Sequence, residues 1–361
     1  MRVFIRADAS ESLGIGHIMR CLSLCEELKN AVEEIIFVCR NLTDSLRQLI
    51  SGKGYSLQEF SSEFSLGSVE EAQQIAQQLS AYISKEKTDY LIIDHYGIDH
   101  VWEEIVSSLF FKTMVIDDLE NRFHSCDILL DTNFSLNNQV RYLSFVPKHT
   151  TRLLGPSYAL LRPEFIQMQN SKKFSLERSE YENKILICFG GTDPTNETLK
   201  TLQALEILNA TKGSQSYEAV VILGGSNTKI KQIEEQYGGK PWVELLVQPP
   251  SMSSAMMRAG FAVCSAGSIT WERYCMGLPA ITIAIAENQI QIAEQGQFLG
   301  IDTYLGESEN ITASSLSSAI SDFLQDSCEE RKERRKKAIQ LVDGEGAARV
   351  AKVLLTMGVN R

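Results

Sequence analysis

Positive charge is scarce in this sequence. Its 361 residues include 35 Lys and Arg against 46 Asp and Glu, so the formal net charge is -11. Nucleic acids and anionic membrane surfaces attract proteins whose basic patches outweigh their acidic residues, and the sequence has no such patch. We therefore exclude nucleic acid and membrane surfaces as partners, and we expect any phosphate group to be bound by backbone amides.

Long apolar runs are also missing. Residues 1–6 lack the apolar segment of a signal peptide, and the longest later apolar run, residues 278–286, is far too short to span a bilayer. We expect a cytoplasmic protein without membrane insertion. Nothing in the pattern indicates assembly, so we expect a monomer.

Sets of metal ligands at the usual spacings are absent. The eight cysteines include no Cys-x-x-Cys pair, and most lie in apolar stretches, where cysteine acts as a small hydrophobic residue. The acidic residues that end predicted strands, Asp94, Asp117 and Asp131, are dispersed, and no Asp-x-Asp pair is present to hold magnesium against a diphosphate. We expect no disulfide framework, no metal and no cofactor.

The most informative feature present is a glycine-rich turn that ends in a histidine. Residues 2–7 predict a short strand, and apolar positions from Ile18 to Leu28 have helical spacing. Ligands of open parallel sheets lie beyond the carboxyl ends of strands, so we expect substrate contacts between Asp8 and Arg20, including Gly14 and Gly16. The positive end of the helix dipole disfavours a protonated His17, which predicts a neutral base.

The same turn is open to two other interpretations. The turn is compatible with a purely structural role, in which His17 only caps the helix or packs against its neighbours. A dinucleotide fingerprint would need a third glycine where Met19 stands, and an acidic residue after strand 35–39, where Arg40 stands. Nicotinamide binding is therefore disfavoured.

The chain length favours two domains, and strands that alternate with helices predict parallel sheets. We predict an α/β fold of two doubly wound, Rossmann-like domains that face a cleft. Residues 1–162 form the first domain, residues 163–183 a short helix and linker, and residues 184–361 the second domain. Strands 90–94 and 113–117 end in acidic residues, which places Asp94 and Asp117 on the same sheet edge as His17.

The second half contains two small-residue turns that are suited to a diphosphate. Each follows an apolar strand and precedes a helix, so the backbone can approach a phosphate closely. Each is also compatible with an ordinary strand-to-helix turn, but two of them on one sheet favour a pyrophosphate site. The residues concerned are Gly190, Gly191 and Thr192 after strand 184–189, and Ser265, Gly267 and Ser268 after strand 261–264.

Three further polar residues are candidates for contacts with the nucleotide sugar. Glu272 lies one helical turn after Ser268 and is placed to accept hydrogen bonds from a ribose diol. Asn288 and Gln289 follow strand 280–284 and are candidates for the sugar or the diphosphate. The alternatives are a solvated helix residue for Glu272 and ordinary loop polarity for the other two.

Taken in order, these motifs resemble the PseG family. The resemblance is carried by residues 6–10, 14–17 with Arg20, 92–97, 155–162, 190–193, 265–268 with Glu272, and 288–289. Members of that family are UDP-2,4-diacetamido-2,4,6-trideoxy-β-L-altropyranose hydrolases of pseudaminic acid biosynthesis, and they are similar in fold to MurG-like GT-B glycosyltransferases. The resemblance therefore implies a small-molecule UDP-sugar substrate.

The resemblance also implies roles for individual residues. His17 matches the catalytic histidine of the family, Tyr96 a tyrosine near the sugar, and Asn288 a residue near the diphosphate. Gly191, Ser268 and Glu272 then lie in the UDP-binding half, and the first domain binds the sugar. The charged stretch 329–337 lies outside the resemblance and is expected to form a solvated helix face.

UDP is a good leaving group, so one base that activates water is sufficient for hydrolysis with inversion. We expect His17 to be that base, oriented by Asp94 or another acceptor on the same edge, with His95 as a competitor by position. A GT-B glycosyltransferase with a UDP-sugar donor and a non-catalytic UDP-sugar-binding protein remain alternatives.

Overall fold

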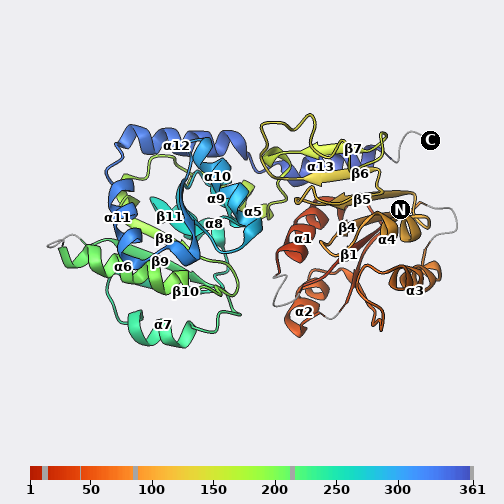
Figure 1. The fold of residues 1–361 in the computed structure, drawn as a ribbon, viewed down its shortest axis with the longest axis horizontal. Coiled ribbons are helices and arrows are strands. Elements are labelled where there is room, and N and C mark those ends of the chain that lie inside the picture. Colours follow the sequence, from red (N-terminus) through yellow and green to blue (C-terminus); the bar gives the residue numbers. More distant parts are fainter. Residues whose placement is uncertain (10–14, 41, 84–87, 212–215, 358–361) are drawn as a thin grey trace. The chain divides into compact units, whose positions relative to one another are not determined.

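The computed structural model describes residues 1–9, 15–40, 42–83, 88–211 and 216–357, and it divides into two compact α/β units. The first unit comprises Met1–Arg162 with Glu345–Arg361, and the second comprises Pro163–Gly344 (Figure 1). Each unit contains one parallel sheet with helices packed against it, which confirms the predicted fold class.

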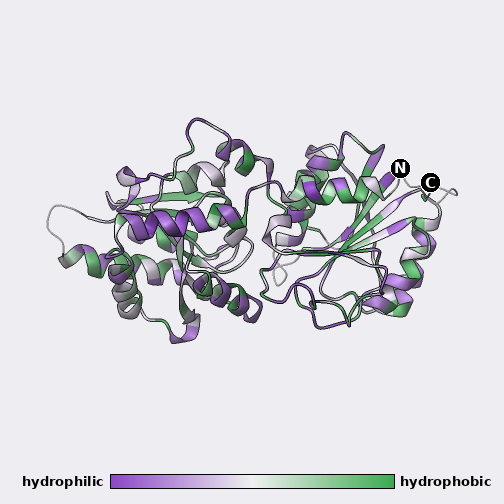
Figure 2. Ribbon diagram, turned by 90° about the horizontal axis from the view of Figure 1, so that it is seen from above, coloured by the Kyte–Doolittle hydropathy of each residue, from purple (hydrophilic) through white to green (hydrophobic). Residues whose placement is uncertain are grey.

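The first unit contains a sheet of seven parallel strands in the order β3-β2-β1-β4-β5-β6-β7. Its inner strands are largely buried and apolar, as expected for a parallel sheet covered on both faces, whereas the outer strands β3 and β7 are only partly buried (Figure 2). They are β1 (Arg2–Ala7), β2 (Glu34–Cys39), β3 (Ser56–Glu59), β4 (Tyr90–Asp94), β5 (Lys112–Ile116), β6 (Ile128–Asp131) and β7 (Thr151–Leu154). The helices described in this unit are α1 (Gly16–Leu28), α2 (Asp44–Gly52), α3 (Val69–Ser80), α4 (His100–Ser107) and α13 (Gly346–Thr356).

The strand order places three chain segments at one edge of this sheet. Strands β1 and β4 are adjacent and parallel, with Ala7 paired to Asp94, and β5 follows β4. The residues that leave the carboxyl ends of these strands therefore meet at the same edge. This edge carries the residues that the sequence predicts for catalysis.

The second unit contains six parallel strands in the order β10-β9-β8-β11-β12-β13. They are β8 (Lys184–Cys188), β9 (Glu218–Leu223), β10 (Val243–Val247), β11 (Phe261–Ser265), β12 (Ala280–Ala284) and β13 (Thr303–Glu307). The helices described here are α5 (Pro163–Gln169), α6 (Glu197–Thr211), α7 (Ile230–Tyr237), α8 (Met252–Met257), α9 (Ile269–Cys275), α10 (Ile290–Phe298), α11 (Ala313–Phe323) and α12 (Cys328–Leu341).

The carboxyl-terminal helix corrects the predicted extent of the second domain, residues 184–361. Helix α13 packs on α1, and its apolar face, with Val350 and Leu354, belongs to the core that surrounds β1. A Cβ atom at Gly346 would lie 2.3 Å from the Ala159 carbonyl oxygen, so glycine permits this close approach. The chain thus returns to the first unit because α13 completes that unit's core.

The segment predicted as a linker, residues 163–183, belongs to the second unit. It contains α5 and a short 3-10 helix (Ser179–Tyr181), and Phe165 and Arg178 within it are buried. The charged helix α12 is likewise not a fully solvated face, because Arg335 is buried and donates to the carbonyl groups of Leu176 and Gly260. The Arg335 guanidinium thus joins the backbone of two segments that lie far apart in the sequence.

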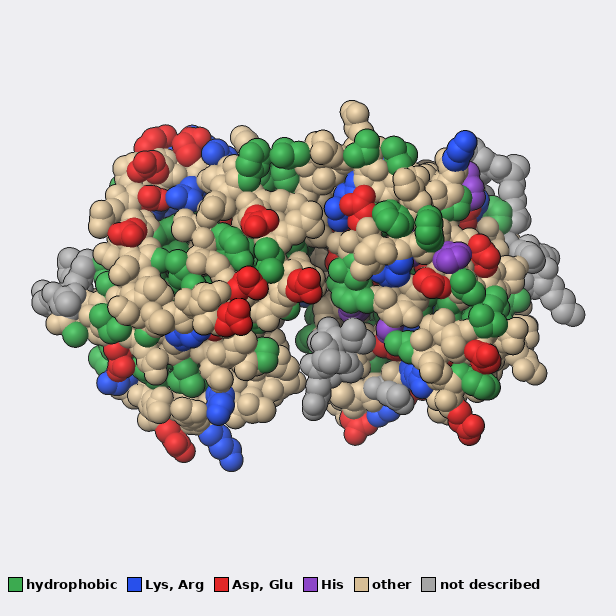
Figure 3. All heavy atoms as spheres, viewed as in Figure 1, with side chains coloured by type: hydrophobic (Ala, Val, Ile, Leu, Met, Phe, Trp, Pro, Cys, Tyr) green, Lys and Arg blue, Asp and Glu red, His purple; other side chains and the backbone are tan. Residues whose placement is uncertain are grey.

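The surface carries charges of both signs. On the face drawn in Figure 3, basic side chains of the described residues are scattered among acidic and uncharged ones. This distribution agrees with the excess of acidic over basic residues in the sequence.

Candidate functional site

His17 lies in the first turn of α1, at the carboxyl edge of the first sheet. The helix begins at Gly16, and its first turn contains no acidic residue, so no carboxylate there offsets the positive end of the helix dipole. The His17 side chain is almost fully buried. Gly14, also expected in this turn, lies outside the described residues.

The His17 imidazole is oriented by Asp94, as the sequence predicts. Its Nδ1 lies 2.5 Å from Asp94 Oδ1, where strand β4 ends. A carboxylate can only accept a hydrogen bond, so Nδ1 carries the proton and donates it to Asp94. This tautomer leaves Nε2 with a lone pair, and Nε2 has no hydrogen-bond partner among the residues that the structure describes. The arrangement is that of a histidine base held by a carboxylate.

Arg20 holds the other side of the Asp94 carboxylate. Its Nε and Nη2 donate to the two Asp94 oxygens, each at 2.6 Å, and its Nη1 donates to Asp118 at 3.1 Å. Burial alone would raise the pKa of Asp94, but the charge of Arg20 and the hydrogen bonds from Arg20 and His17 hold it well below its ordinary value. Arg20 was expected to contact substrate. In the structure it holds the Asp94 carboxylate that bonds to His17.

Asp8 and His95 form a second buried pair beside this group. Asp8 accepts hydrogen bonds from Arg6 and from the Arg40 backbone amide, and its Oδ2 lies 3.4 Å from His95 Nε2. His95 Nδ1 accepts from the Gly97 amide at 2.8 Å, so Nε2 carries the proton and faces Asp8. The ring's one acceptor, Nδ1, is occupied by the Gly97 amide, and Nε2 is buried and faces Asp8, which makes His95 unsuited to act as the base.

Tyr96 and Asp118 complete the accessible part of this edge. The Tyr96 ring packs edge-on against the His17 ring, with centroids 4.7 Å apart and an interplanar angle of 81°. Burial and the neighbouring Asp118 carboxylate raise the pKa of Tyr96 above its ordinary value. The Asp118 side chain is 18% exposed, whereas Asp94 is fully buried.

Asp118 is the residue at this edge that sequence reasoning missed. Asp117 was singled out as the acidic end of its strand, but β5 ends at Ile116 and Asp117 is buried. It accepts hydrogen bonds from Tyr142 at 2.6 Å and forms an ion pair with Arg122 at 2.7 Å. The sequence signal was the pair Asp117-Asp118, in which the first carboxylate turns inward and the second faces Arg20.

In the second unit, the turn after β8 is built from glycine and a helix cap. Gly190 has a φ of 80°, a conformation that favours glycine, and both Gly190 and Gly191 are exposed. Asp193 accepts from the amides of Glu197 and Thr198, at 2.9 and 3.0 Å, and so caps α6. Thr192 is half-buried. This exposed backbone at the carboxyl end of a central strand is accessible to a ligand, and the phosphate contact stays a prediction.

A glycine that the sequence reasoning did not consider supports this turn. Gly224 follows the neighbouring strand β9, and a Cβ atom there would lie 2.3 Å from the Gly191 carbonyl oxygen. The two turns are therefore in backbone contact, and a larger residue at position 224 would displace Gly191. The signal available in the sequence was the pair Gly224-Gly225 at a predicted strand end.

The turn after β11 approaches the loop after β12. Ser265 is buried, whereas Ser268 is exposed and its side chain makes no capping hydrogen bond to α9. A Cβ atom at Gly267 would lie 3.7 Å from the Gln289 amide nitrogen, and Gln289 Oε1 accepts from the Ile285 amide at 3.1 Å. Asn288 is exposed beside Gln289. Glu272 is half-buried on α9.

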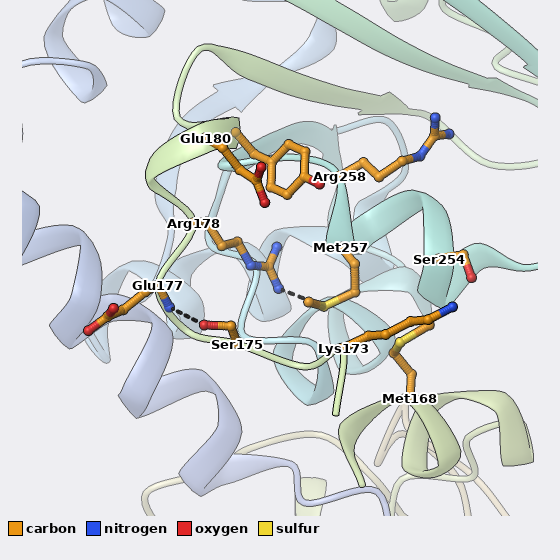
Figure 4. A pocket seen from close by; sticks show the side chains of 10 residues that line it. Met168, Lys173, Ser175, Glu177, Arg178, Glu180, Ser254, Met257 and Arg258 are labelled. Carbon is orange, nitrogen blue, oxygen red and sulfur yellow. Dashed lines mark hydrogen bonds between the residues drawn. The ribbon is translucent and has the colours of Figure 1, made fainter. Parts of the chain in front are cut away.

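One cavity of about 570 Å³ lies at this carboxyl edge of the second sheet. Its walls are the residues that follow β8, β12 and β13, and Lys200 contributes to them. A second cavity, of about 420 Å³, lies at the opposite edge (Figure 4). There Arg178 donates to the carbonyl oxygens of Met256, Ala259 and Met276, so it bonds the ends of α8 and α9. Neither cavity is lined by any of the predicted site residues, and Arg178 has a structural role in the second.

Known proteins resemble both units. Residues 185–353 match the Glycosyltransferase family 28 C-terminal domain. The UDP-2,4-diacetamido-2,4,6-trideoxy-beta-L-altropyranose hydrolase of Campylobacter jejuni is 30% identical over 290 residues, which cover 80% of this chain and 93% of that protein. The chain belongs to the PseG family.

Two further relatives extend the comparison over the whole chain. The spore coat polysaccharide biosynthesis protein SpsG of Bacillus subtilis is 22% identical over 360 residues, covering 98% of each protein. The crystal structure of MurG from Acinetobacter baumannii matches with a TM-score of 0.66 and 12% identity, over 99% of this chain and 100% of the other. At that identity the likeness concerns the fold alone, which is the GT-B fold.

Two properties of the described residues bear on how this PseG-family chain works. None of its described helices is both long and apolar enough to cross a membrane. Within the same residues, no three His, Cys, Asp or Glu side chains come together in a way that would hold a metal ion. The acidic residues at the first sheet edge are instead engaged by arginine and histidine side chains.

Proposed function

We propose that this protein is a UDP-sugar hydrolase. Its substrate is UDP-linked 2,4-diacetamido-2,4,6-trideoxy-β-L-altrose, and its products are UDP and the free sugar. Membership of the PseG family supports the substrate class. The observation that carries the hydrolytic assignment is the His17 imidazole, which donates from Nδ1 to Asp94 and keeps Nε2 as a proton acceptor.

In the proposed reaction, a water molecule attacks the anomeric carbon of the sugar. Its oxygen forms the new bond to that carbon, and the bond from the carbon to the diphosphate oxygen breaks, with the electron pair leaving on UDP. The water proton passes to His17 Nε2, and Asp94 stabilises the imidazolium that forms. Attack opposite the departing UDP inverts the anomeric centre, and no carboxylate nucleophile is needed.

We assign UDP binding to the second unit. The exposed backbone at Gly190 and Gly191 and the exposed Ser268 hydroxyl are suited to the diphosphate. Glu272, Asn288 and Gln289 remain candidates for the ribose and the sugar. Asp94 and Asp117 are occupied by arginine, so the mechanism assigns no metal to them.

The second candidate is a glycosyltransferase that uses the same donor. It is favoured by the match of residues 185–353 to the Glycosyltransferase family 28 C-terminal domain. A transferase would use His17 in the same way, but to deprotonate an acceptor hydroxyl. The two functions therefore differ in what reaches the anomeric carbon and not in the base.

One assay separates these functions. The purified protein is incubated with the UDP-linked diacetamido sugar in ¹⁸O-labelled water, without any acceptor. We expect UDP and free sugar to appear together, with one labelled oxygen in the sugar. Label in UDP would indicate attack at phosphorus, whereas binding without release of free sugar would support a transferase or a binding protein.

A further inference from the structure

The Asp94 carboxylate binds the base and an arginine at the same time. Its Oδ1 accepts from His17 Nδ1 at 2.5 Å and from Arg20 Nη2 at 2.6 Å. Its Oδ2 accepts from Arg20 Nε at 2.6 Å and from the Cys21 thiol at 3.5 Å. His17 and Arg20 therefore share one oxygen of a carboxylate that is completely buried.

Arg20 also lies directly beside the base. Its Nη2 is 3.2 Å from His17 Nδ1. Both nitrogens carry protons and donate to Asp94, so they do not bond each other. A proton added at His17 Nε2 would place an imidazolium in contact with a guanidinium. A carboxylate without such a neighbouring cation favours the protonated form of a histidine that it binds, whereas here Arg20 already compensates the carboxylate charge.

Two further titratable side chains contact the base or Asp94, and both are neutral. The Tyr96 ring packs against the imidazole from the loop after β4, and the Cys21 thiol donates to Asp94 from α1. Burial raises the pKa of the Tyr96 phenol and of the Cys21 thiol, so both keep their protons at neutral pH. These two groups add no charge beside His17.

Two further carboxylates at this edge are each paired with an arginine. Asp118, which lies after β5, is 3.1 Å from Arg20 Nη1. Asp8, which follows β1, is 2.6 Å from Arg6 and 3.4 Å from His95 Nε2. Arg20 is the arginine that contacts both the base and its carboxylate.

We propose that Arg20 is a positioning residue that acts through Asp94: it offsets the charge of this carboxylate, so that Asp94 orients His17 without holding it in the protonated form. The inference rests on the proposed function and deepens it, because it names what keeps the proposed base ready to accept a proton. A general base is most effective when its neutral form is well populated at the working pH. This role differs from a substrate contact, which would affect binding at every pH.

The first experiment compares the pH profiles of kcat/KM for wild type, Arg20→Gln and Arg20→Lys. Glutamine keeps an N–H donor for Asp94 without the charge, whereas lysine keeps the charge. In Arg20→Gln we expect the acid limb of the profile to move about 1 to 2 units to higher pH, because a cation beside the base is lost. The deficit should then be about tenfold to hundredfold on the acid side and small on the plateau. Arg20→Lys should keep the wild-type limb.

Three results would contradict this role. A deficit in Arg20→Gln that is equal at every pH would mean that the arginine only packs or binds substrate. A limb that moves as far in Arg20→Lys as in Arg20→Gln would mean that the charge has no effect. The dissociation constant of UDP, measured by calorimetry, should stay at the wild-type value in both variants, and a tenfold loss would assign Arg20 to the ligand instead.

Arg2→Gln is the matched control. Arg2 pairs with the buried Asp89 at 2.6 Å, at the amino ends of β1 and β4, far from the base along the same two strands. This variant also leaves a buried aspartate without its arginine, and thermal melting compares its loss of stability with that of Arg20→Gln. Its pH profile should coincide with that of the wild type. A shifted limb in Arg2→Gln would show that lost stability alone moves the profile, and the case for Arg20 would fall.

The proposal can fail independently of the proposed function. ¹³C-histidine NMR of the ligand-free protein follows the protonation of His17 without turnover, and His17→Asn assigns its signal among the five histidines. In Arg20→Gln, the titration midpoint of this signal should lie about 1 to 2 units above that of the wild type. An unchanged midpoint would refute the role of Arg20 even in an active hydrolase. The expected shift in a protein that releases no free sugar would support this role and refute the hydrolase assignment alone.

Discussion

The carboxyl edges of the two sheets, where the parallel strands end, present different chemical groups. At the first, polar side chains bond one another: Asp94 accepts hydrogen bonds from His17 and Arg20 at 2.5–2.6 Å. At the second, the exposed groups are mainly glycine backbone and small hydroxyl side chains, with Gly190 and Gly191 on the turn after β8. Both edges lie at the carboxyl ends of parallel strands, where such folds place their ligands.

This difference separates chemistry from binding. A general base must have a defined tautomer and orientation, which requires side-chain partners such as Asp94. A diphosphate carries its own charge and needs only amide and hydroxyl donors that can approach closely. The following predictions test whether the two functions can be impaired separately.

The largest effect is expected at the first edge. His17→Asn should lower kcat by about 10² to 10⁴-fold, because it removes the general base. The dissociation constant of UDP should stay unchanged, since UDP is assigned to the second unit. Steady-state kinetics of UDP release and calorimetric titration with UDP measure the two quantities, and wild-type turnover in this variant would remove His17 from the mechanism.

A second effect concerns the stability of the first unit, through the buried side chain of His124. Burial would lower the pKa of His124, but the neighbouring Asp117 and Glu103 carboxylates outweigh burial and raise that pKa from 6.5 to about 9. His124 Nδ1 bonds Glu103 at 2.7 Å, and Nε2 lies 3.6 Å from Asp117. A raised histidine pKa contributes stability that is present below pH 6.5 and lost as the pH rises through 9. We expect the first unit to lose about 3 kcal/mol of stability, relative to His124→Gln, between pH 6 and about pH 10.

Hydrogen exchange of the β5 and β6 amides measures this stability, with wild type and His124→Gln compared at each pH. Amides of β8 and β11 in the second unit serve as the internal control, and their difference between the two proteins should stay near zero. A pH-independent difference at β5 and β6 would mean that His124 does not change its charge in this range.

The alternation of apolar strands and helices was sufficient to predict both parallel sheets and the meeting of His17 with Asp94. The strands that precede these residues are adjacent in the sheet, so any side chains at their carboxyl ends come together. Asp117 lies directly after β5, as predicted, but the sequence could not show which of two adjacent carboxylates is buried, because one residue decides whether a carboxylate points inward or outward. Only the packed structure separates Asp117 from Asp118.

The local sequence pattern could not predict which unit the carboxyl-terminal helix joins. Helix α13 has an apolar face, and the unit that it joins depends on the core around β1, which is formed by residues between Val3 and Leu160. Gly224 was missed for a related reason. Its importance comes from its contact with Gly191, a residue on a different strand end.

A third prediction addresses the second edge. No atom would lie within 4 Å of a Cβ at Gly191, so Gly191→Ala should fold with a stability within about 0.5 kcal/mol of wild type. The added methyl group would keep phosphate from the backbone, and we expect UDP affinity to fall about tenfold. Gly239→Ala, where a Cβ also meets nothing within 4 Å, is the matched control and should bind UDP normally. Unchanged UDP affinity in Gly191→Ala would place the diphosphate elsewhere.

The smallest effect is expected at Ser268. Its side chain is exposed and makes no capping hydrogen bond to α9, so Ser268→Ala removes no intramolecular hydrogen bond that stabilises the helix. If the hydroxyl contacts a phosphate oxygen, UDP affinity should fall about threefold to tenfold while the melting temperature stays constant. Ser314→Ala, on an exposed position of α11, is the matched control. A loss of stability without a loss of affinity would show that Ser268 supports the turn and does not bind the ligand, and the second edge would then act through its backbone alone.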